Sequence, residues 1–268
     1  MGLVCSQGGQ DKQSKQGSRV RALAFDLAIL AGHLLLYPTG IRQERPPATP
    51  PPDLLGHRPV LLLHGFIDNR SVFVLLRRSL LRHGRQHVEA LNYSPLTCDL
   101  RTAAALLARH VEDVLARTGH SQVDIVGHSL GGLIARYYVQ RLGGDVRVHS
   151  LVTLGTPHSG TRIAPLLSAH PLVRQMCPDS EVITELRQPA PECRTRFVSF
   201  WSDVDQLMIP AEVARIDHPD LIFRNIRVSG VGHLALPVHS AVAAGVREAL
   251  DAAPNATRTD TSGAFSVA

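Results

Sequence analysis

The sequence predicts an α/β fold in which helices flank a central, mostly parallel β-sheet. Three observations support it: short apolar runs alternate with amphipathic segments through residues 58–250, the first run stops at a His-Gly pair, and a later run leads into a Gly-x-Ser-x-Gly turn. Such alternation is typical of parallel sheets, because each crossover helix packs back onto the sheet. The chain has 268 residues, 44% of them hydrophobic, which is enough for one core of this kind.

The predicted strands are short apolar runs bounded by polar or turn residues, as buried parallel strands should be. In chain order they are residues 60–63, 88–91, 123–126, 146–154, 196–201 and 222–228. The predicted helices include 71–83, 130–142 and 240–250. A further helix is expected to begin after Asp99, a good N-cap residue, and to end at Gly119.

The ends of the chain and one connector differ in composition from residues 58–250. Residues 1–18 are polar and rich in Gly and Gln, and residues 251–268 are small and polar, so both are predicted to be disordered tails. Residues 38–57 are rich in proline and predict an extended connector. We therefore expect a single folded domain over 58–250, preceded by one helix.

That helix is predicted over residues 19–37, an apolar segment with a polar stripe. Arg19, Asp26 and His33 follow one another at a spacing of two helical turns and so share one narrow face. This pattern favours a helix that packs on the protein or makes peripheral contact with a lipid surface, because a spanning helix needs ~20 clean apolar residues. No small-residue cleavage site follows, so we expect a cytoplasmic or cell-associated protein rather than a secreted one.

Charge and cysteine content argue against two classes of function. The formal net charge is +5, but basic residues are interspersed with acidic ones and only 4% of residues are aromatic, so no nucleic-acid partner is expected. The 4 cysteines form no Cys-x-x-Cys pair, and neither a metal site nor a cofactor is expected. Cys177 and Cys193 bracket a Pro-rich segment and are equally consistent with a disulfide and with two free thiols.

The motif that carries chemistry is Gly127-His128-Ser129-Leu130-Gly131, which stands between a predicted strand and a predicted helix. A nucleophile elbow requires this context, because glycines let strand and helix approach closely around a strained serine. A glycine-rich turn that happens to contain a serine is the alternative, and the flanking elements disfavour it. Ser129 is therefore the candidate nucleophile.

A serine hydroxyl needs a base to remove its proton and a carboxylate to orient that base. In this arrangement both follow the serine along the chain, which narrows the choice among the 14 histidines. His233, in a loop just past the last predicted strand, is the candidate base. Asp203 and Asp205 both follow the preceding strand. Asp205 is the preferred acid by its loop position, and Asp203 is expected to cap or brace the turn.

The tetrahedral intermediate of such a reaction needs two aimed N–H donors. The residue after the nucleophile supplies one, so we expect the backbone N–H of Leu130 there. The second is expected from the loop after the first strand, at the backbone N–H of Phe66 in His64-Gly65-Phe66. A buried His-Gly turn without this role is the alternative.

These residues also carry a resemblance to a known family. Residues 60–66, 123–133, 152–161 and 230–233 resemble the bacterial α/β-hydrolase lipases and esterases, particularly the triacylglycerol lipase type of actinobacteria. The resemblance extends over about residues 59–250 and implies the α/β-hydrolase fold. It further implies that nucleophile, acid and base fall on Ser129, Asp205 and His233, and the oxyanion donors on Phe66 and Leu130.

Apolar residues around the candidate loops predict a neutral, hydrophobic ester as substrate. We expect the acyl group to contact Phe66, Ile67, His128, Leu207 and Leu234, and no Arg or Lys stands beside the candidate acid or base. The predicted function is a serine hydrolase that cleaves carboxylic esters of hydrophobic acyl chains, as in lipids, through an acyl-enzyme.

Alternatives remain at this point. An acyltransferase or thioesterase would use the same three residues with another acceptor or substrate. A non-catalytic scaffold that binds a small molecule or protein is disfavoured by the intact set. The insertion at residues 161–194 is apolar and partly helical, which suits a small cap over the serine and, equally, ordinary packing at the sheet edge.

Overall fold

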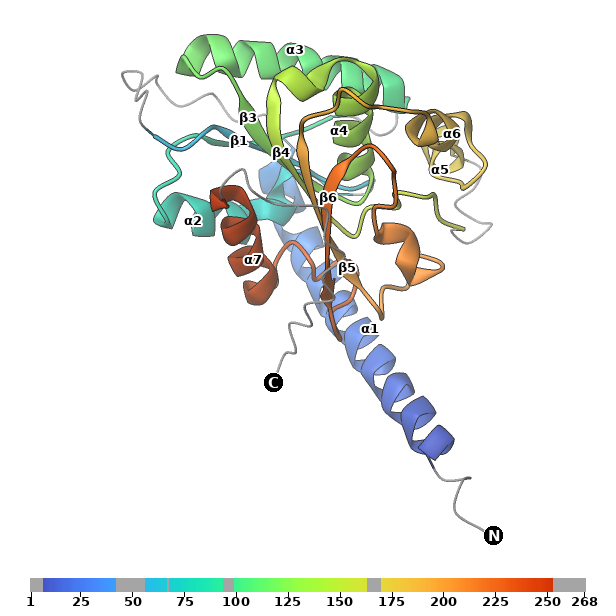
Figure 1. The fold of residues 1–268 in the computed structure, drawn as a ribbon. Coiled ribbons are helices and arrows are strands. Elements are labelled where there is room, and N and C mark those ends of the chain that lie inside the picture. The colour runs from blue at the N-terminus through green and yellow to red at the C-terminus, as the bar shows by residue number, and fades with distance from the viewer. Residues whose placement is uncertain (1–6, 42–55, 67, 94–98, 163–169, 253–268) are drawn as a thin grey trace.

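The structure is a computed structural model, and it describes residues 7–41, 56–66, 68–93, 99–162 and 170–252. In this part of the chain six parallel strands form one sheet in the order β2-β1-β3-β4-β5-β6 (Figure 1). The predicted α/β fold with a parallel sheet is confirmed. Each strand lies within two residues of its predicted bounds: β1 Val60–Leu63, β2 Val88–Leu91, β3 Val123–His128, β4 Val148–Leu154, β5 Arg196–Ser202 and β6 Ile222–Val228.

Helices cover both faces of the sheet (Figure 1). One face carries α3 Leu100–Thr118 and α4 Leu130–Arg141, and the other carries α2 Val74–Arg82 and α7 Ser240–Asp251. Short 3-10 turns complete the framework: η1 Arg70–Phe73 before α2, η2 Gly144–Val146 before β4, and η4 Ala211–Ala214 after β5. The helix predicted over 71–83 is therefore a 3-10 turn followed by an α-helix.

Two buried clusters lie on either side of the sheet, and neighbouring residues of a strand feed different ones. Leu61 and Leu63 point into the cluster under α3 and α4. Val60 and Leu62 point into the cluster under α2 and α7. Side chains alternate across a strand, so a strand buried on both faces has to be apolar at every position.

The ends of α3 agree with the capping residues read from the sequence. Asp99 is the N-cap, and its side chain accepts a hydrogen bond from the backbone N–H of Thr102 at 2.9 Å. Gly119 ends the helix in the left-handed conformation, with φ 72°. A residue without a Cβ atom adopts that conformation at no steric cost, so the glycine terminates α3.

The N-terminal helix is longer than predicted at both ends and runs over Gln7–Gly40 as α1. Residues 7–18 therefore belong to a helix and not to a disordered tail. These residues are too polar to form a hydrophobic core of their own. However, the apolar helix that follows them is already formed, and adding turns to an existing helix avoids the cost of helix nucleation. At the other end the helix continues past residue 37, and side chains of the domain donate hydrogen bonds to the carbonyl oxygens of Tyr37, Thr39 and Gly40. The Pro-rich connector thus begins later than predicted, and residues 42–55 lie outside the described residues.

The insertion at 161–194 contributes both to the site and to the core. Its described helices are α5 Pro171–Gln175 and α6 Glu181–Arg187, and residues 163–169 lie outside the description. Val173 and Met176 line the cavity at Ser129. The buried residues of α6 join the cluster under α3 and α4. Cys177 and Cys193 are free thiols in this arrangement.

Candidate active site

Ser129 lies at the sharp turn between β3 and α4, in a strained backbone conformation. Its φ is 52° and its ψ −120°, and it is the only non-glycine residue with positive φ in the described part of the chain. The next strand holds this turn. The backbone N–H of Ser129 donates to the carbonyl of Leu154 at 2.9 Å, and the hydroxyl of Thr156 donates to the Ser129 carbonyl at 2.9 Å. The strain is thus supported from outside the turn, as is common at functional sites.

Glycines on both sides allow strand and helix to pass closely. A Cβ atom on Gly127 would lie 2.5 Å from the backbone nitrogen of Gly132, and one on Gly132 would collide with the side chain of Thr156. The first N–H groups of a helix have no partner within it. The backbone N–H of Leu130, the first residue of α4, is therefore suited to bind a developing oxyanion.

His233 and Asp205 form a buried pair in the loops that follow β6 and β5. His233 Nδ1 lies 2.8 Å from Asp205 Oδ2. The other carboxylate oxygen, Oδ1, accepts backbone N–H bonds from Leu207 at 2.9 Å and from Met208 at 3.1 Å. With Nδ1 donating to the carboxylate, Nε2 is the ring nitrogen that can accept a proton.

Asp203 lies on the same loop but has different partners. Its Oδ2 pairs with the Arg227 guanidinium, and its Oδ1 accepts from the backbone N–H of Gly230 at 3.3 Å. These contacts tie the ends of β5 and β6 together near the surface. The structure therefore brings Asp205, and not Asp203, to the imidazole.

The contact between Asp205 and His233 lowers the pKa of the carboxyl group and raises the pKa of the imidazole, so it favours the charged form of each group. Burial, the largest single influence, would lower the pKa of His233, but attraction and hydrogen bonding to Asp205 together with the charges of Asp26 and Asp68 raise this pKa above its ordinary value. Burial alone would raise the pKa of Asp205, but His233 and the two backbone N–H groups lower it. An ionised carboxylate thus faces an imidazole that is a stronger base than free histidine.

Ser129 and His233 line one cavity of about 110 Å³, and most of the predicted substrate-binding residues lie around it. Ile67, also predicted there, lies outside the described residues. The cavity wall is mainly apolar, and besides His233 its titratable members are Asp68 and His128, whose Oδ2 and Nδ1 atoms lie 3.6 Å apart. The lining residues are Gly65, Phe66, Asp68, His128, Ser129, Val173, Met176, Leu207, Met208, His233 and Leu234.

A contribution that the sequence analysis missed comes from α1, whose polar stripe faces the site. Asp26 Oδ1 accepts a hydrogen bond from the backbone N–H of Ala235, just after the candidate base, at 3.1 Å. His33 Nδ1 lies 3.5 Å from Asp68 Oδ1, and Asp68 Oδ2 lies 3.6 Å from His128 Nδ1. The spacing of Asp26 and His33 was a signal for a shared face, but it could not indicate which loops that face would meet.

His128 links this second cluster to the candidate base. Its Nε2 lies 3.2 Å from the backbone carbonyl oxygen of His233, and the two rings are 4.8 Å apart. Burial lowers the pKa of His128, so burial favours the neutral imidazole there. The ring therefore supports the His233 loop and closes one side of the cavity.

None of the remaining described histidines after Ser129 is among the residues that line this cavity. His158 is buried between the hydroxyl of Thr153 and the guanidinium of Arg136, and burial lowers its pKa well below the ordinary value. His218 Nε2 lies 3.0 Å from the carbonyl oxygen of Gln188. His239 is the N-cap residue of α7. Among the described residues, no group of three or more His, Cys, Asp or Glu side chains is placed to hold a metal ion.

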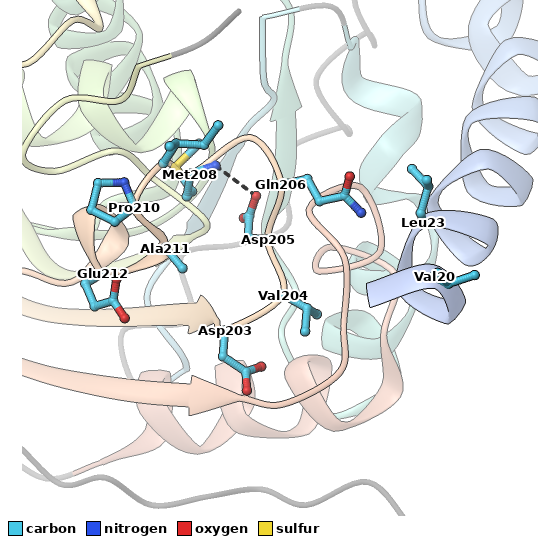
Figure 2. Close-up of a pocket in the computed structure, with 11 residues that line it drawn as sticks. Val20, Leu23, Asp203, Val204, Asp205, Gln206, Met208, Pro210, Ala211 and Glu212 are labelled. Atoms are coloured by element: carbon cyan, nitrogen blue, oxygen red, sulfur yellow. Dashed lines mark hydrogen bonds between the residues drawn. The ribbon is translucent and has the colours of Figure 1, made fainter. Parts of the chain in front are cut away.

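A second, larger hollow lies beside the acid-bearing loop. Figure 2 shows Val20 and Leu23 of α1 on one side and the loop from Asp203 to Glu212 on the other. Its volume is about 610 Å³. Met208 belongs to the walls of both hollows. This one side chain therefore lies between the cavity at Ser129 and the groove at α1.

Comparison with known sequences agrees with the fold. Residues 58–172 match the family model of the α/β hydrolase fold. The chain is 32% identical over 154 residues to a triacylglycerol lipase of Burkholderia plantarii, covering 54% of this chain and 41% of that protein. It is 34% identical over 114 residues to a triacylglycerol lipase of Pseudarthrobacter phenanthrenivorans, covering 40% and 35%. The chain thus spans less than half the length of these curated relatives.

Solved structures show the same architecture. Lipase B of Aspergillus fumigatus superposes with a TM-score of 0.67 at 18% identity, over 78% of this chain and 56% of that one. The mature lipase BlEst2 of Bacillus licheniformis superposes with a TM-score of 0.61 at 15% identity, over 79% and 96%. At these identities the likeness establishes the fold alone.

Proposed function

We propose that this chain, an α/β-hydrolase by its fold and its family match, is a serine hydrolase that cleaves carboxylic esters of hydrophobic acyl chains. The observation that carries the proposal is the convergence of three groups. The strained Ser129 and the buried His233 line one apolar cavity, and the ring of His233 is held by Asp205 at 2.8 Å. The similarity to triacylglycerol lipases gives independent support.

In the proposed reaction His233 Nε2 takes the proton of the Ser129 hydroxyl as Oγ attacks the ester carbonyl. The backbone N–H groups of Leu130 and Phe66 bind the oxyanion that forms. The imidazolium then gives its proton to the leaving alcohol, and an acyl-enzyme remains on Ser129. Water, activated by His233 in the same way, attacks the acyl-enzyme and releases the carboxylic acid.

The role of Asp205 is electrostatic and orienting. Its two backbone hydrogen bonds fix the carboxylate, and its contact with Nδ1 selects the tautomer whose Nε2 accepts the proton. It also stabilises the imidazolium that forms in each half of the reaction. The raised pKa of His233 is consistent with both effects.

The walls of the cavity support a neutral acyl group. Phe66, Val173, Met176 and Leu234 contribute carbon surface, and among the described residues no Arg or Lys lines this cavity. An acyltransferase or a thioesterase would use the same residues with an alcohol acceptor or a thioester substrate. Product analysis with a long-chain alcohol present separates transfer from hydrolysis.

A chain-length series of nitrophenyl esters, measured on the wild type and on Ser129→Ala, tests the proposal. We expect Ser129→Ala to lose at least about 10³-fold in kcat, because no other group in the cavity replaces the nucleophile. A circular dichroism melt of each protein controls for folding. Equal turnover by both proteins would overturn the mechanism, and the preferred ester would define the acyl length.

A further inference from the structure

The N-terminal helix presents an unusual surface, with its polar side toward the protein and its apolar side outward. From Leu23 to Leu36 every exposed residue is Ala, Leu or Phe. Leu35 is 82% exposed and Leu34 65% exposed. The two polar side chains in this stretch, Asp26 and His33, face the domain. An ordinary surface helix has the opposite arrangement.

The inner side of α1 is held along most of this length. Beyond Asp26 and His33, three domain side chains donate to carbonyl oxygens at the end of the helix. The side-chain nitrogens of Asn69, Arg70 and Asn92 lie 2.9 Å from the Tyr37 carbonyl oxygen, 2.9 Å from that of Thr39 and 2.6 Å from that of Gly40. From Asp26 to Gly40 the axis rises about 21 Å at 1.5 Å per residue. The orientation of the helix is therefore fixed by the domain.

We infer that the outward face of α1 binds an anionic lipid surface and lies in the plane of that surface. The exposed apolar positions from Leu23 to Leu36 cover an arc of about 220° at 3.6 residues per turn. A protein partner that packs on a helix typically covers an apolar stripe of about 100°. Lipid, in contrast, contacts the whole arc at once, so a lipid surface fits this face better than a second copy of the chain.

The charges next to the apolar face favour anionic lipid. The sequence places Lys12, Lys15, Arg19 and Arg21 along the helix before the apolar stretch, with Asp11 as the one acidic residue between Gln7 and Phe25. A basic segment beside an apolar helical face is attracted to anionic headgroups while the apolar side chains enter the acyl region.

The docking of α1 favours a helix that lies on the membrane over one that crosses it. Val20–Gly40 is long and apolar enough to span a bilayer, and 11% of an apolar 18-residue window within it is buried. However, the contacts from Asp26 to Gly40 hold it along the side of the domain (Figure 1). A domain attached over that length would have to enter the hydrocarbon with it. Immersion of the outward face alone avoids this cost.

This placement brings the lipid surface to the active-site loops. Val20 and Leu23 of α1 and Met208 of the loop line the groove beside the acid-bearing loop (Figure 2). Ile209 lines the same groove. It is 48% exposed and adds apolar surface on the loop side of this groove. If the proposed function holds, ester substrates reach Ser129 from the membrane side. The binding of α1 to lipid does not depend on that function.

Vesicle flotation of the full chain tests the inference. The probes are phosphatidylcholine vesicles with and without 25% phosphatidylglycerol, and the test variant is Leu34→Ser/Leu35→Ser. We expect the wild type to float with the anionic vesicles and the variant to bind at least about tenfold more weakly. The control Leu75→Ser/Val146→Ser removes two residues that are also exposed, at 56% and 65%, but lie elsewhere, and it should bind like the wild type.

Two further measurements define the outcomes. Lys12→Gln/Lys15→Gln should weaken binding to the anionic vesicles only. Thermal melts check that every variant is folded. If the wild type does not hydrolyse esters, the proposed function is overturned, but the outcome of the vesicle experiment is unaffected. The inference would be overturned if the wild type did not float with the anionic vesicles, or if the Leu34→Ser/Leu35→Ser variant floated as well as the wild type. Dimerisation in solution that the Leu34/Leu35 variant abolishes, without vesicle binding, would assign the face to a second copy.

Discussion

Asp26 and Ala235 are joined by a hydrogen bond although 209 positions separate them along the chain. Asp26 Oδ1, on the N-terminal helix, accepts the backbone N–H of Ala235 at 3.1 Å. Ala235 follows the candidate base by two residues, and a Cβ atom on Gly232, at the other side of that base, would collide with the Asp26 carboxylate. The loop that carries His233 is thus fitted around a side chain from outside the α/β domain.

Asp26→Asn should change the pH dependence of ester hydrolysis. The charge of Asp26 is one of the groups that raise the pKa of His233, and the amide retains an oxygen for Ala235. We therefore expect the acidic limb of kcat/KM to move to lower pH, with activity at its plateau changed less than about tenfold. Asp26→Ala, which also removes the acceptor, should lower the plateau further. A purely structural role would lower the activity of Asp26→Asn without moving the limb, and Asp113→Asn on the exposed face of α3 is the control.

Asp205→Asn and Asp203→Asn form a matched pair on one loop. Asp205→Asn should lower kcat by about 10³- to 10⁴-fold. The amide N–H can donate to Nδ1 of His233, which favours the tautomer protonated at Nε2, and the neutral amide does not stabilise the imidazolium. Asp203→Asn removes a partly exposed pair with Arg227 and should change kcat less than about tenfold. The comparison is made under saturating nitrophenyl ester. Equal losses in the two variants would contradict the assignment of Asp205.

The sequence predicted the framework well because each of its signals is local. The apolar run of β1, the Asp99 cap and the Gly119 stop each depend on a few neighbouring residues, and the structure has them at the expected positions. The signal for the turn at Ser129 is local in the same sense, because its glycines are needed where one strand and the next helix pass closely.

The relationships that sequence reasoning missed are those between distant segments. The stripe of Asp26 and His33 indicated a common face, yet nothing in the pattern identified Ala235 and Asp68 as its partners. The predicted length of the N-terminal helix was wrong, because the polar composition of residues 7–18 indicates that they form no core but does not determine whether their backbone is helical. The assignment of cavity walls to Val173 and Met176 required the tertiary packing of the insertion.

The pH profile of the wild type should reflect the raised pKa of His233. The base must be neutral to accept a proton, so kcat/KM should fall as the pH drops below a value higher than 6.5. The stability of the fold depends on pH in the opposite direction. Because the pKa of His233 is higher in the folded than in the unfolded chain, its ion pair with Asp205 contributes fully below the unfolded pKa of His233, and this contribution is lost as the pH rises through the folded pKa. In Asp205→Asn the lowering effect of burial dominates, so its residual activity should persist to lower pH. A wild-type limb below 6.5 would contradict the paired state.

Gly132→Ala should destabilise the fold around the elbow. Its Cβ atom would collide with the side chain of Thr156, whose hydroxyl holds the Ser129 carbonyl at 2.9 Å. We expect a loss of about 1–3 kcal/mol in the free energy of unfolding, measured by urea denaturation. Gly32→Ala is the matched control, because no atom lies within 4 Å of the added Cβ atom. An alanine there should leave stability unchanged or raise it by about 0.5–1 kcal/mol through helix propensity. Equal effects at both positions would show that the close approach at Gly132 is not limiting.

Met208→Ala should lengthen the acyl chains that the protein accepts. Met208 lines both the cavity of about 110 Å³ at Ser129 and the groove of about 610 Å³ beside α1. Its backbone N–H, which holds Asp205, is retained in the variant, so the candidate acid keeps its hydrogen bonds. Removing the side chain joins the two spaces, and the optimum of the nitrophenyl ester series should move to longer chains. Met176→Ala enlarges the cavity without reaching the groove and should shift the optimum less. An equal shift in both variants would mean that the groove does not receive the chain.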